Sequence, residues 1–211
     1  RDYVDAFRRR GIRAVHWLPV ACDPHVHRDP GGARPYDVGF VGSLTNSAER
    51  ARLVRTLASR FTLNEQRFYS TEELAAVYGA SKIVANWTVN GDLTLRVFEA
   101  MACGALLVAQ DVGNGQEQLF KHGVHLVTVK TVEEAVDAVK YYLAHESERR
   151  LIAQRGRDCV RSEHRWTDRA TQILETMVAS RRTAWIRSCS PREMFRLYGQ
   201  LFAWWRVVDP I

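Results

Sequence analysis

An arginine and a glutamate stand three residues apart in an otherwise apolar segment, residues 93–108. The apolar spacing predicts a helix that carries Arg96 and Glu99 on one face, because residues three apart are neighbours on a helix surface. The segment then reaches Gly104, a residue typical of left-handed helix caps, and continues as an apolar strand. The two charged side chains are therefore expected on a short helix that stops sharply.

The chemistry of this pair suits a phosphate and a sugar. The predicted helix follows the polar loop 90–92, and a helix N-terminus offers free N–H groups and a positive end to a phosphate. Arg96 can add a charged fork to the same phosphate, and Glu99 can accept hydrogen bonds from sugar hydroxyls. Together these groups make a cradle for a nucleotide-sugar. The alternative is an ion pair between Arg96 and Glu99 on a solvated face, which contributes little to stability.

Length, composition and charge narrow the class of protein. The chain has 211 residues, of which 46% are hydrophobic, and a net charge of +6. It is long enough to form a large domain with a substantial core. The positive charge suits an anionic ligand, an acidic membrane surface or nucleic acid. No basic run with interleaved aromatic residues is typical of a nucleic-acid groove, so we expect no nucleic-acid partner.

The cysteines and histidines do not form a convincing metal site. The four cysteines are far apart and unpatterned: Cys22, Cys103, Cys159 and Cys189. A metal at Cys22, His25 and His27 is disfavoured, because no second ligand cluster is visible and Pro24 fixes an extended turn. We therefore expect no bound metal. Because we find no signal peptide and no apolar run that could span a bilayer, we expect a cytoplasmic protein. The first residue, Arg1, is compatible with a fragment of a longer protein.

Short apolar strands alternate with helices along most of the chain. Strands are expected at 14–20, 37–41, 61–66, 82–87, 105–109 and 124–129. Helices are expected at 2–10, 46–60, 71–78, 93–103, 115–120, 131–143, 147–162 and 167–180. Two capping boxes, Asn46 with Glu49 and Ser70 with Glu73, place two of the helix starts. The alternation predicts an α/β fold with a doubly wound, Rossmann-like parallel sheet and extra C-terminal helices.

In doubly wound folds, ligands bind beyond the carboxyl ends of the strands. Three loops rich in glycine or asparagine are expected there: 42–46, 88–93 and 110–115. Asn86 ends the strand before the second loop, where it can reach a ligand or cap a local turn. Tyr69 follows a predicted strand and can stack on a base, although a core or surface aromatic residue is the more common case.

Composition divides the chain into three parts. Residues 1–35 are an N-terminal segment and interdomain linker, 36–180 a Rossmann-like domain, and 181–211 a C-terminal amphipathic tail. The tail has apolar residues on one helical face after Pro191. We expect that face to pack on a neighbouring domain or a dimer partner. The alternative is peripheral contact with an anionic membrane, led by the basic and aromatic residues of the tail.

Residues 18–178 resemble the C-terminal, donor-binding domain of GT-B glycosyltransferases, and especially the CgeB-like members of the glycosyltransferase group 1 families. Four segments carry the likeness: WLPVACDP (17–24), DVGFVGSL (37–44), YGASKIVANW (78–87) and RVFEAMACGALLV (96–108). The last segment and the order of all four are the most specific features.

The resemblance implies that the chain binds a nucleotide-sugar donor, with a UDP- or GDP-sugar expected, and transfers its sugar to an acceptor that the sequence does not identify. It implies catalysis without a tightly held metal or other cofactor. Glu99 matches the glutamate that holds the donor ribose, and Arg96 is expected on the diphosphate. The other expected donor contacts lie at the ends of two strands and at the helix start: Gly42, Ser43, Leu44, Asn86, Asp92, Leu93, Thr94 and Leu95.

Three departures from the family pattern matter. Many group 1 enzymes carry a second glutamate upstream of the first, with seven residues between them; at that position this chain has Gly91, with Asp92 beside it. The Arg and Lys that often follow the glycine loop are represented by Arg50 alone. Only the second of the two GT-B domains is visible, so we expect activity to need an N-terminal domain that holds the acceptor. These departures keep open whether the reaction retains or inverts the anomeric configuration. They also keep open an alternative, a degenerate, non-catalytic GT-B-like scaffold.

Overall fold

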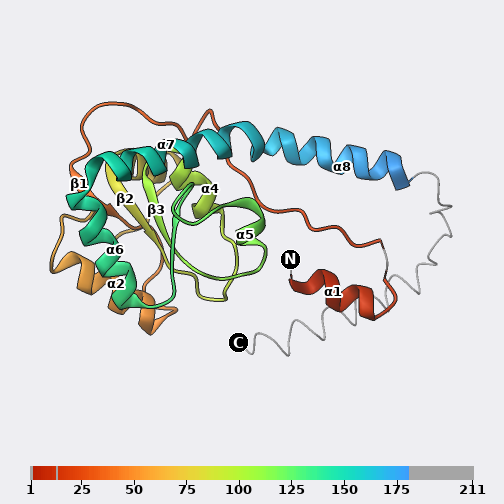
Figure 1. The fold of residues 1–211 in the computed structure, drawn as a ribbon, viewed down its shortest axis with the longest axis horizontal. Coiled ribbons are helices and arrows are strands. Elements are labelled where there is room, and N and C mark those ends of the chain that lie inside the picture. Colours follow the sequence, from red (N-terminus) through yellow and green to blue (C-terminus); the bar gives the residue numbers. More distant parts are fainter. Residues whose placement is uncertain (1, 13, 181–211) are drawn as a thin grey trace. The chain divides into compact units, whose positions relative to one another are not determined.

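The computed structural model describes residues 2–12 and 14–180 (Figure 1). The chain forms two compact units, Arg1–Ala170 and Thr171–Ile211. In the second unit the described residues form the end of helix α8 (Trp166–Ser180). The amphipathic helix expected after Pro191 lies outside the described residues. Everything reported below concerns the first unit.

A parallel sheet is the centre of the first unit (Figure 1). The strands are β1 (Tyr36–Gly39), β2 (Ser81–Asn86), β3 (Leu106–Gln110) and β4 (Val127–Val129). The register pairs Val38 with Ile83, Ile83 with Leu106, and Val108 with Val127. The strands lie in sequence order, so each is connected to the next by a crossover. The predicted α/β class and parallel sheet are therefore confirmed.

The isolated bridge between Val38 and Leu63 shows where the order in which the chain adds strands to the sheet changes direction. Val38 of β1 pairs with Ile83 on one side and forms an isolated parallel bridge with Leu63 on the other. After β1 the chain therefore passes outward to residue 63 and then returns across β1 to form β2. A reversal of this kind is the topological switch point, and it opens a crevice beyond the carboxyl ends of the two diverging strands.

The helices follow the expected alternation. Those of the first unit are α1 (Asp2–Arg9), α2 (Ala48–Ala58), α3 (Thr71–Gly79), α4 (Leu95–Ala102), α5 (Gln116–Leu119), α6 (Val132–Ala144) and α7 (Glu146–Glu163), followed by the start of α8. The capping box of Ser70 and Glu73 is confirmed at the start of α3. The cap of α2 is Ser47 rather than the predicted Asn46, because the Ser47 side chain accepts from the Arg50 N–H.

Two predicted strands differ from the structure. Residues 14–20 form no strand, and Pro19 in this segment lacks the N–H that a ladder needs. Its carbonyl instead accepts a hydrogen bond from Nε of Arg169 (2.8 Å). The strand expected at 61–66 is reduced to the bridge at Leu63. Both segments are tied to the domain by separate hydrogen bonds rather than by a continuous ladder.

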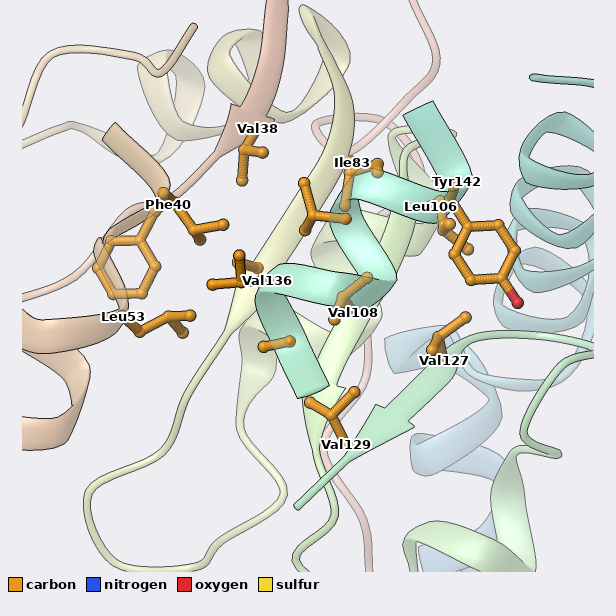
Figure 2. Close-up of a cluster of buried hydrophobic side chains, with 14 of the residues drawn as sticks. Val38, Phe40, Leu53, Ile83, Leu106, Val108, Val127, Val129, Val136 and Tyr142 are labelled. Carbon is orange, nitrogen blue, oxygen red and sulfur yellow. The ribbon is translucent and has the colours of Figure 1, made fainter. Parts of the chain in front are cut away.

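The strands bury both faces. Ile83 and Leu106 point into one apolar cluster, whereas the adjacent Val84 and Leu107 point into another, as the two-residue period of a strand requires. Helices α2 and α6 cover the first face, and Figure 2 shows Val136 of α6 among side chains from the strands. Helices α3 and α4 cover the second face, with α7 packed on α4. This double cover explains the nearly continuous apolar strands.

The packing of α7 depends on one glycine. A Cβ atom at Gly156 would collide with the backbone carbonyl of His125 and lie 3.1 Å from Sδ of Met101 on α4. The absence of a side chain therefore lets α7 approach α4 and the loop before β4. This contact holds α7 against α4, the helix that carries Arg96 and Glu99.

Candidate functional site

The candidate site lies at the switch point, where the loop after β1 meets the loop after β2. Arg50 of α2 joins them, because its Nε donates to the carbonyl of Trp87 (2.8 Å) and its Nη1 to the carbonyl of Ser43 (3.1 Å). Burial lowers the pKa of the Arg50 guanidinium, and the nearby charge of Arg96 lowers it further. Two arginines therefore make this crevice positive, and one of them holds its two walls together.

Helix α4 begins at the second loop with polar groups that have no protein partner. Thr94 is the N-cap and has an extended backbone, but its side chain makes no capping hydrogen bond. Its Oγ1 is buried without a partner among the described residues. The first N–H groups of any helix also lack partners within the helix. Because buried polar groups are normally hydrogen-bonded, this helix start is suited to a ligand oxygen.

Arg96 lies in the first turn of α4, against the glycine loop. A Cβ atom at Gly42 would be 3.6 Å from Cζ of Arg96, so the guanidinium is in contact distance of the loop backbone. Nε of Arg96 is buried and has no hydrogen-bond partner in the described part of the chain. A larger side chain at position 42 would occupy the space next to this cation. The absence of a side chain at Gly42 thus leaves room for an anion beside Arg96.

Glu99 is buried beside a histidine. Its side chain is 12% exposed, and its Oε1 is 3.6 Å from Nε2 of His27, too far for a hydrogen bond. Within residues 2–12 and 14–180 it makes no side-chain hydrogen bond and no ion pair with Arg96, so the solvated ion pair considered from the sequence is not formed. Burial raises the pKa of the Glu99 carboxyl, and the charges of His27 and Arg96 oppose that increase. This carboxylate is therefore largely shielded from water and receives no hydrogen bond from the described residues.

Two adjoining pockets share Arg96 and Leu74. One has a volume of about 620 Å³, and the residues that line it are Val41, Gly42, Ser43, Leu44, Gln66, Arg67, Phe68, Tyr69, Leu74 and Arg96. The other has a volume of about 440 Å³, and the residues that line it are Val20, Leu74, Asp92, Leu93, Thr94, Leu95, Arg96 and Glu99. Arg96 thus stands between a space bounded by the glycine loop and a space bounded by the start of α4.

Nearly all of the expected donor contacts surround these pockets. The glycine-loop residues Gly42, Ser43 and Leu44 line the first pocket. The residues from Asp92 to Leu95, together with Glu99, line the second. Asn86 is buried at the end of β2 and lines neither pocket. The structure therefore brings together residues from two separate stretches of the chain, with Arg96 at their junction.

The sequence analysis singled out Tyr69 and missed two contributions, the neighbours of Tyr69 in the loop 66–69 and His27. The loop 66–69 forms a wall of the first pocket, where Phe68 is 90% exposed and Cζ of Arg67 lies 4.2 Å above the Tyr69 ring. An Arg-Phe-Tyr run after a strand end was the available signal. The second contribution is His27, whose ring nitrogens are both buried without a hydrogen-bond partner in the described structure. No local pattern relates it to Glu99, which lies far away in the sequence.

The cysteine and histidine positions do not favour a metal. Cys22 is completely buried, which raises the pKa of its thiol to about 11, and His25 is exposed. In the described residues one cluster with suitable ligand atoms is formed by Cys159, Glu163 and His164. There Nη2 of Arg169 donates to Nδ1 of His164 (2.8 Å), which leaves the proton on Nε2 and a positive charge beside the ring. Both effects oppose cation binding.

Comparisons with known proteins identify the class to which this fold and site belong. The sequence profile of the family described as "Glycosyl transferase-like" matches residues 38–175. The chain belongs to this family, and its fold is that of the C-terminal domain of GT-B glycosyltransferases. No curated protein sequence is significantly similar to the chain.

Three solved structures are similar in fold. Sucrose-phosphate synthase from Thermosynechococcus elongatus has a TM-score of 0.57 at 19% identity, over 94% of this chain and 56% of that protein. The C-terminal domain of the group 1 glycosyl transferase LpcC from Francisella tularensis has a TM-score of 0.54 at 15% identity, over 69% and 99%. HepE from Anabaena, solved with UDP and glucose, has a TM-score of 0.52 at 17% identity, over 67% and 39%. The chain thus spans about half the length of the first of these proteins.

None of the helices among the described residues is both long and apolar enough to cross a membrane.

Proposed function

We propose that this chain is the donor-binding domain of a glycosyltransferase that transfers a sugar from a nucleotide-sugar, with a UDP- or GDP-sugar expected. The observation that carries the proposal is the set of unpartnered polar groups along α4. Oγ1 of Thr94 and Nε of Arg96 are buried without hydrogen-bond partners among the described residues. The Glu99 carboxylate lies 3.6 Å from Nε2 of His27, beyond hydrogen-bond distance, and all three residues line the second pocket. HepE, a protein of similar fold, was solved with UDP and glucose, which supports this class of donor.

Arg96 and the start of α4 are proposed to bind the diphosphate. The phosphate oxygens would accept from the guanidinium and from the N–H groups of Thr94 and Leu95, and Gly42 leaves space for them. In sugar transfer the nucleoside diphosphate departs as negative charge develops on it. Fixed positive groups in a crevice from which water is partly excluded stabilise that charge more in the transition state than in the ground state. This mechanism requires no metal ion.

Glu99 is proposed to bind the ribose. When the carboxyl is ionised, both of its oxygens accept hydrogen bonds and neither donates one. The two ribose hydroxyls would supply the donors that the described residues do not. The ligand therefore offsets part of the cost of burying this charge. His27 lies on the other side of Glu99 and is proposed to position the carboxylate.

The loop 66–69 is proposed to hold the nucleobase. The exposed ring of Phe68 and the Arg67–Tyr69 pair offer flat faces at the wall of the first pocket. Stacking of this kind accepts any base, because every base has a π face. The choice between uracil and guanine would then depend on hydrogen bonds from the loop backbone.

Transfer to an acceptor is proposed to require a second, N-terminal GT-B domain. Group 1 enzymes that resemble this chain hold the acceptor mainly on that domain, and the chain spans about half of a similar full-length protein. We expect the 211-residue chain alone to bind nucleotide and to transfer little sugar. As a narrower assignment, we also propose that the chain is a CgeB-like glycosyltransferase domain.

The test compares UDP with uridine. Substitution Arg96→Gln removes a charged donor to phosphate, and charge-assisted hydrogen bonds contribute about 1.5–3 kcal/mol each. UDP affinity should therefore fall about tenfold or more, whereas the affinity for uridine, which has no phosphate, should not change. The matched control is Arg155→Gln, an exposed arginine on α7 that lines neither pocket. Calorimetric titration of all three proteins with both ligands gives the result, and an equal loss for uridine would contradict the assignment of Arg96.

The scaffold alternative has one observation in its favour. Gly91, at the position where many group 1 enzymes have a second glutamate, has open space around it and a φ of +65°. A thermal-shift comparison with UDP, GDP, ADP and dTDP separates the two functions. Stabilisation by one nucleotide supports a donor site, because a ligand that binds only the folded state raises the melting temperature. No stabilisation by any of the four would favour the scaffold.

A further inference from the structure

A separate pocket lies at the opposite edge of the sheet, at the amino ends of the strands. It has a volume of about 390 Å³. Its residues include Arg34 just before β1, Lys82 at the start of β2 and Gly104 just before β3. The first turns of α7 form another wall. No residue assigned to the donor site lines this pocket, so it is spatially distinct from the crevice at the carboxyl ends of the strands.

Positive charge is in excess in this pocket. Five cationic side chains line it: Arg34, Lys82, Arg149, Arg150 and Arg157. Four carboxylates pair with them. Asp29 contacts Arg34 (2.8 Å) and Arg157 (3.1 Å), Asp158 also contacts Arg157 (3.3 Å), Asp37 contacts Lys82 (2.7 Å), and Glu146 contacts Arg150. Each carboxylate is thus already engaged by a cation, and the cations outnumber the carboxylates by one in the described structure.

Arg149 carries most of this imbalance. It is 6% exposed, and its Nε is buried without a hydrogen-bond partner in the described part of the chain. Its Nη1 donates to the carbonyl of Lys82 (3.2 Å), and its nearest carboxylate, on Glu146, is 3.7 Å away and shared with Arg150. Burial lowers the pKa of Arg149, and the charges of Arg150 and Arg34 lower it further. A buried guanidinium with neighbours of the same sign is costly unless an anion is close.

We propose that this pocket binds a phosphate group, either inorganic phosphate or the phosphate of a small monoester. Its negative charge would balance the cation in excess at Arg149. The planar fork of a guanidinium matches the geometry of phosphate oxygens, and phosphate would supply an acceptor to the unpartnered Nε of Arg149. The volume exceeds that of a single phosphate, so the pocket has room for a small organic group attached to it. The proposal does not depend on the donor site.

The test uses the full 211-residue chain and two probes, inorganic phosphate and glycerol 3-phosphate, in calorimetric titrations. The main variant is Arg150→Gln, because Arg150 is 73% exposed and its loss should not affect folding. The matched control is Arg155→Gln, which makes the same charge change on an exposed face of the same helix outside the pocket. Arg149→Gln, a buried substitution, is measured in parallel, with its melting temperature recorded.

Saturable binding of at least one probe is expected, weakened about fivefold by Arg150→Gln and more strongly by Arg149→Gln. Arg155→Gln and the donor-site variant Arg96→Gln should leave it unchanged. Tighter binding of glycerol 3-phosphate would identify a monoester as the ligand, and equal binding would identify free phosphate. The proposal is overturned by the absence of saturable binding in the low-millimolar range, by equal weakening in Arg155→Gln, or by a loss confined to Arg96→Gln.

Discussion

Replacing Glu99 by glutamine should make the empty protein more stable and the nucleotide complex weaker. The side chain is 12% exposed, and Nε2 of His27 is 3.6 Å from its Oε1. Glu99→Gln removes the buried charge while it keeps the volume and one acceptor oxygen. Because burial raises the pKa of this carboxyl, the charged form is disfavoured in the free protein. The same charge is what the proposed ribose contact requires.

The expected loss of affinity follows from the contacts that a carboxylate can make. A hydrogen bond to a charged group contributes about 1.5–3 kcal/mol, so UDP should bind at least about tenfold more weakly. At a UDP concentration about 100 times the wild-type Kd, ligand stabilises the protein by about 2.7 kcal/mol, and a tenfold weaker site retains about 1.4 kcal/mol. With about 2–4 °C per kcal/mol, the rise in Tm should fall from about 5–11 °C to about 3–6 °C.

The stability of the free protein should depend on pH through the same residue. The folded-state pKa of Glu99 lies above the ordinary glutamate pKa of 4.5, so the folded protein binds the proton more tightly than the unfolded chain. Its contribution to stability is complete below about pH 4.5 and is lost as the pH rises through the folded-state pKa. Glu99→Gln should remove this pH dependence and raise the Tm of the free protein above that pKa. UDP affinity should fall more steeply on acidification in the wild type than in Glu99→Gln, because the variant keeps only the decrease due to protonation of the UDP phosphate.

A thermal-shift series with and without UDP, at several pH values, measures the stability of the free protein, its stabilisation by UDP and the pH dependence of both. The matched control is Glu117→Gln, an exposed carboxylate on α5 that lines neither pocket. It should match the wild type in its UDP response. If Glu99→Gln showed the full wild-type response to UDP and an unchanged Tm without ligand, the assignment of Glu99 as a dehydrated ribose acceptor would be wrong.

Three further predictions test packing and the loop wall. Tyr78→Phe should raise the Tm by about 2–4 °C, because the buried Tyr78 hydroxyl has no partner among the described residues and its removal relieves about 1 kcal/mol; a lower Tm would show that the hydroxyl is satisfied. Gly156→Ala should lower the Tm, because the new Cβ collides with the carbonyl of His125. The higher helix propensity of alanine, about 1 kcal/mol, opposes this loss, and an unchanged or higher Tm in thermal unfolding would show that the collision is relieved. Phe68→Ala should weaken UDP binding about fivefold or more while it changes stability by less than about 0.5 kcal/mol, and an unchanged affinity would exclude base stacking on this ring.

The elements that position the site were predictable because their signals are local. The apolar spacing around Arg96 and the glycine after it predict a helix at 93–103, and the helix is Leu95–Ala102. Gly104 has a φ of +76°, as a left-handed cap requires. The strands were found within one to three residues of their observed starts, since buried strands of a parallel sheet are continuous apolar runs.

The remaining parts of the site depend on contacts between distant segments. His27 reaches Glu99 because the segment before β1 is held against α8 through backbone hydrogen bonds of Cys22 with His164 and Trp166. No periodicity in the sequence reports such a contact. The same is true of the imbalance of charge around Arg149, which depends on which carboxylates fold close to it. The sequence shows the charges but not their neighbours.

Arg50 has a consequence for how sites of this kind can diversify. One rigid, planar group holds the carbonyls of Ser43 and Trp87, so it sets the width of the opening independently of the other side chains in the two loops. Under the proposed donor-binding function, substitutions at Leu44 or Asp92 would change which sugar fits without changing the separation of the walls. The width of the opening and the selectivity of the proposed site would then vary independently, so that a single substitution could change the donor preference while the width stays the same.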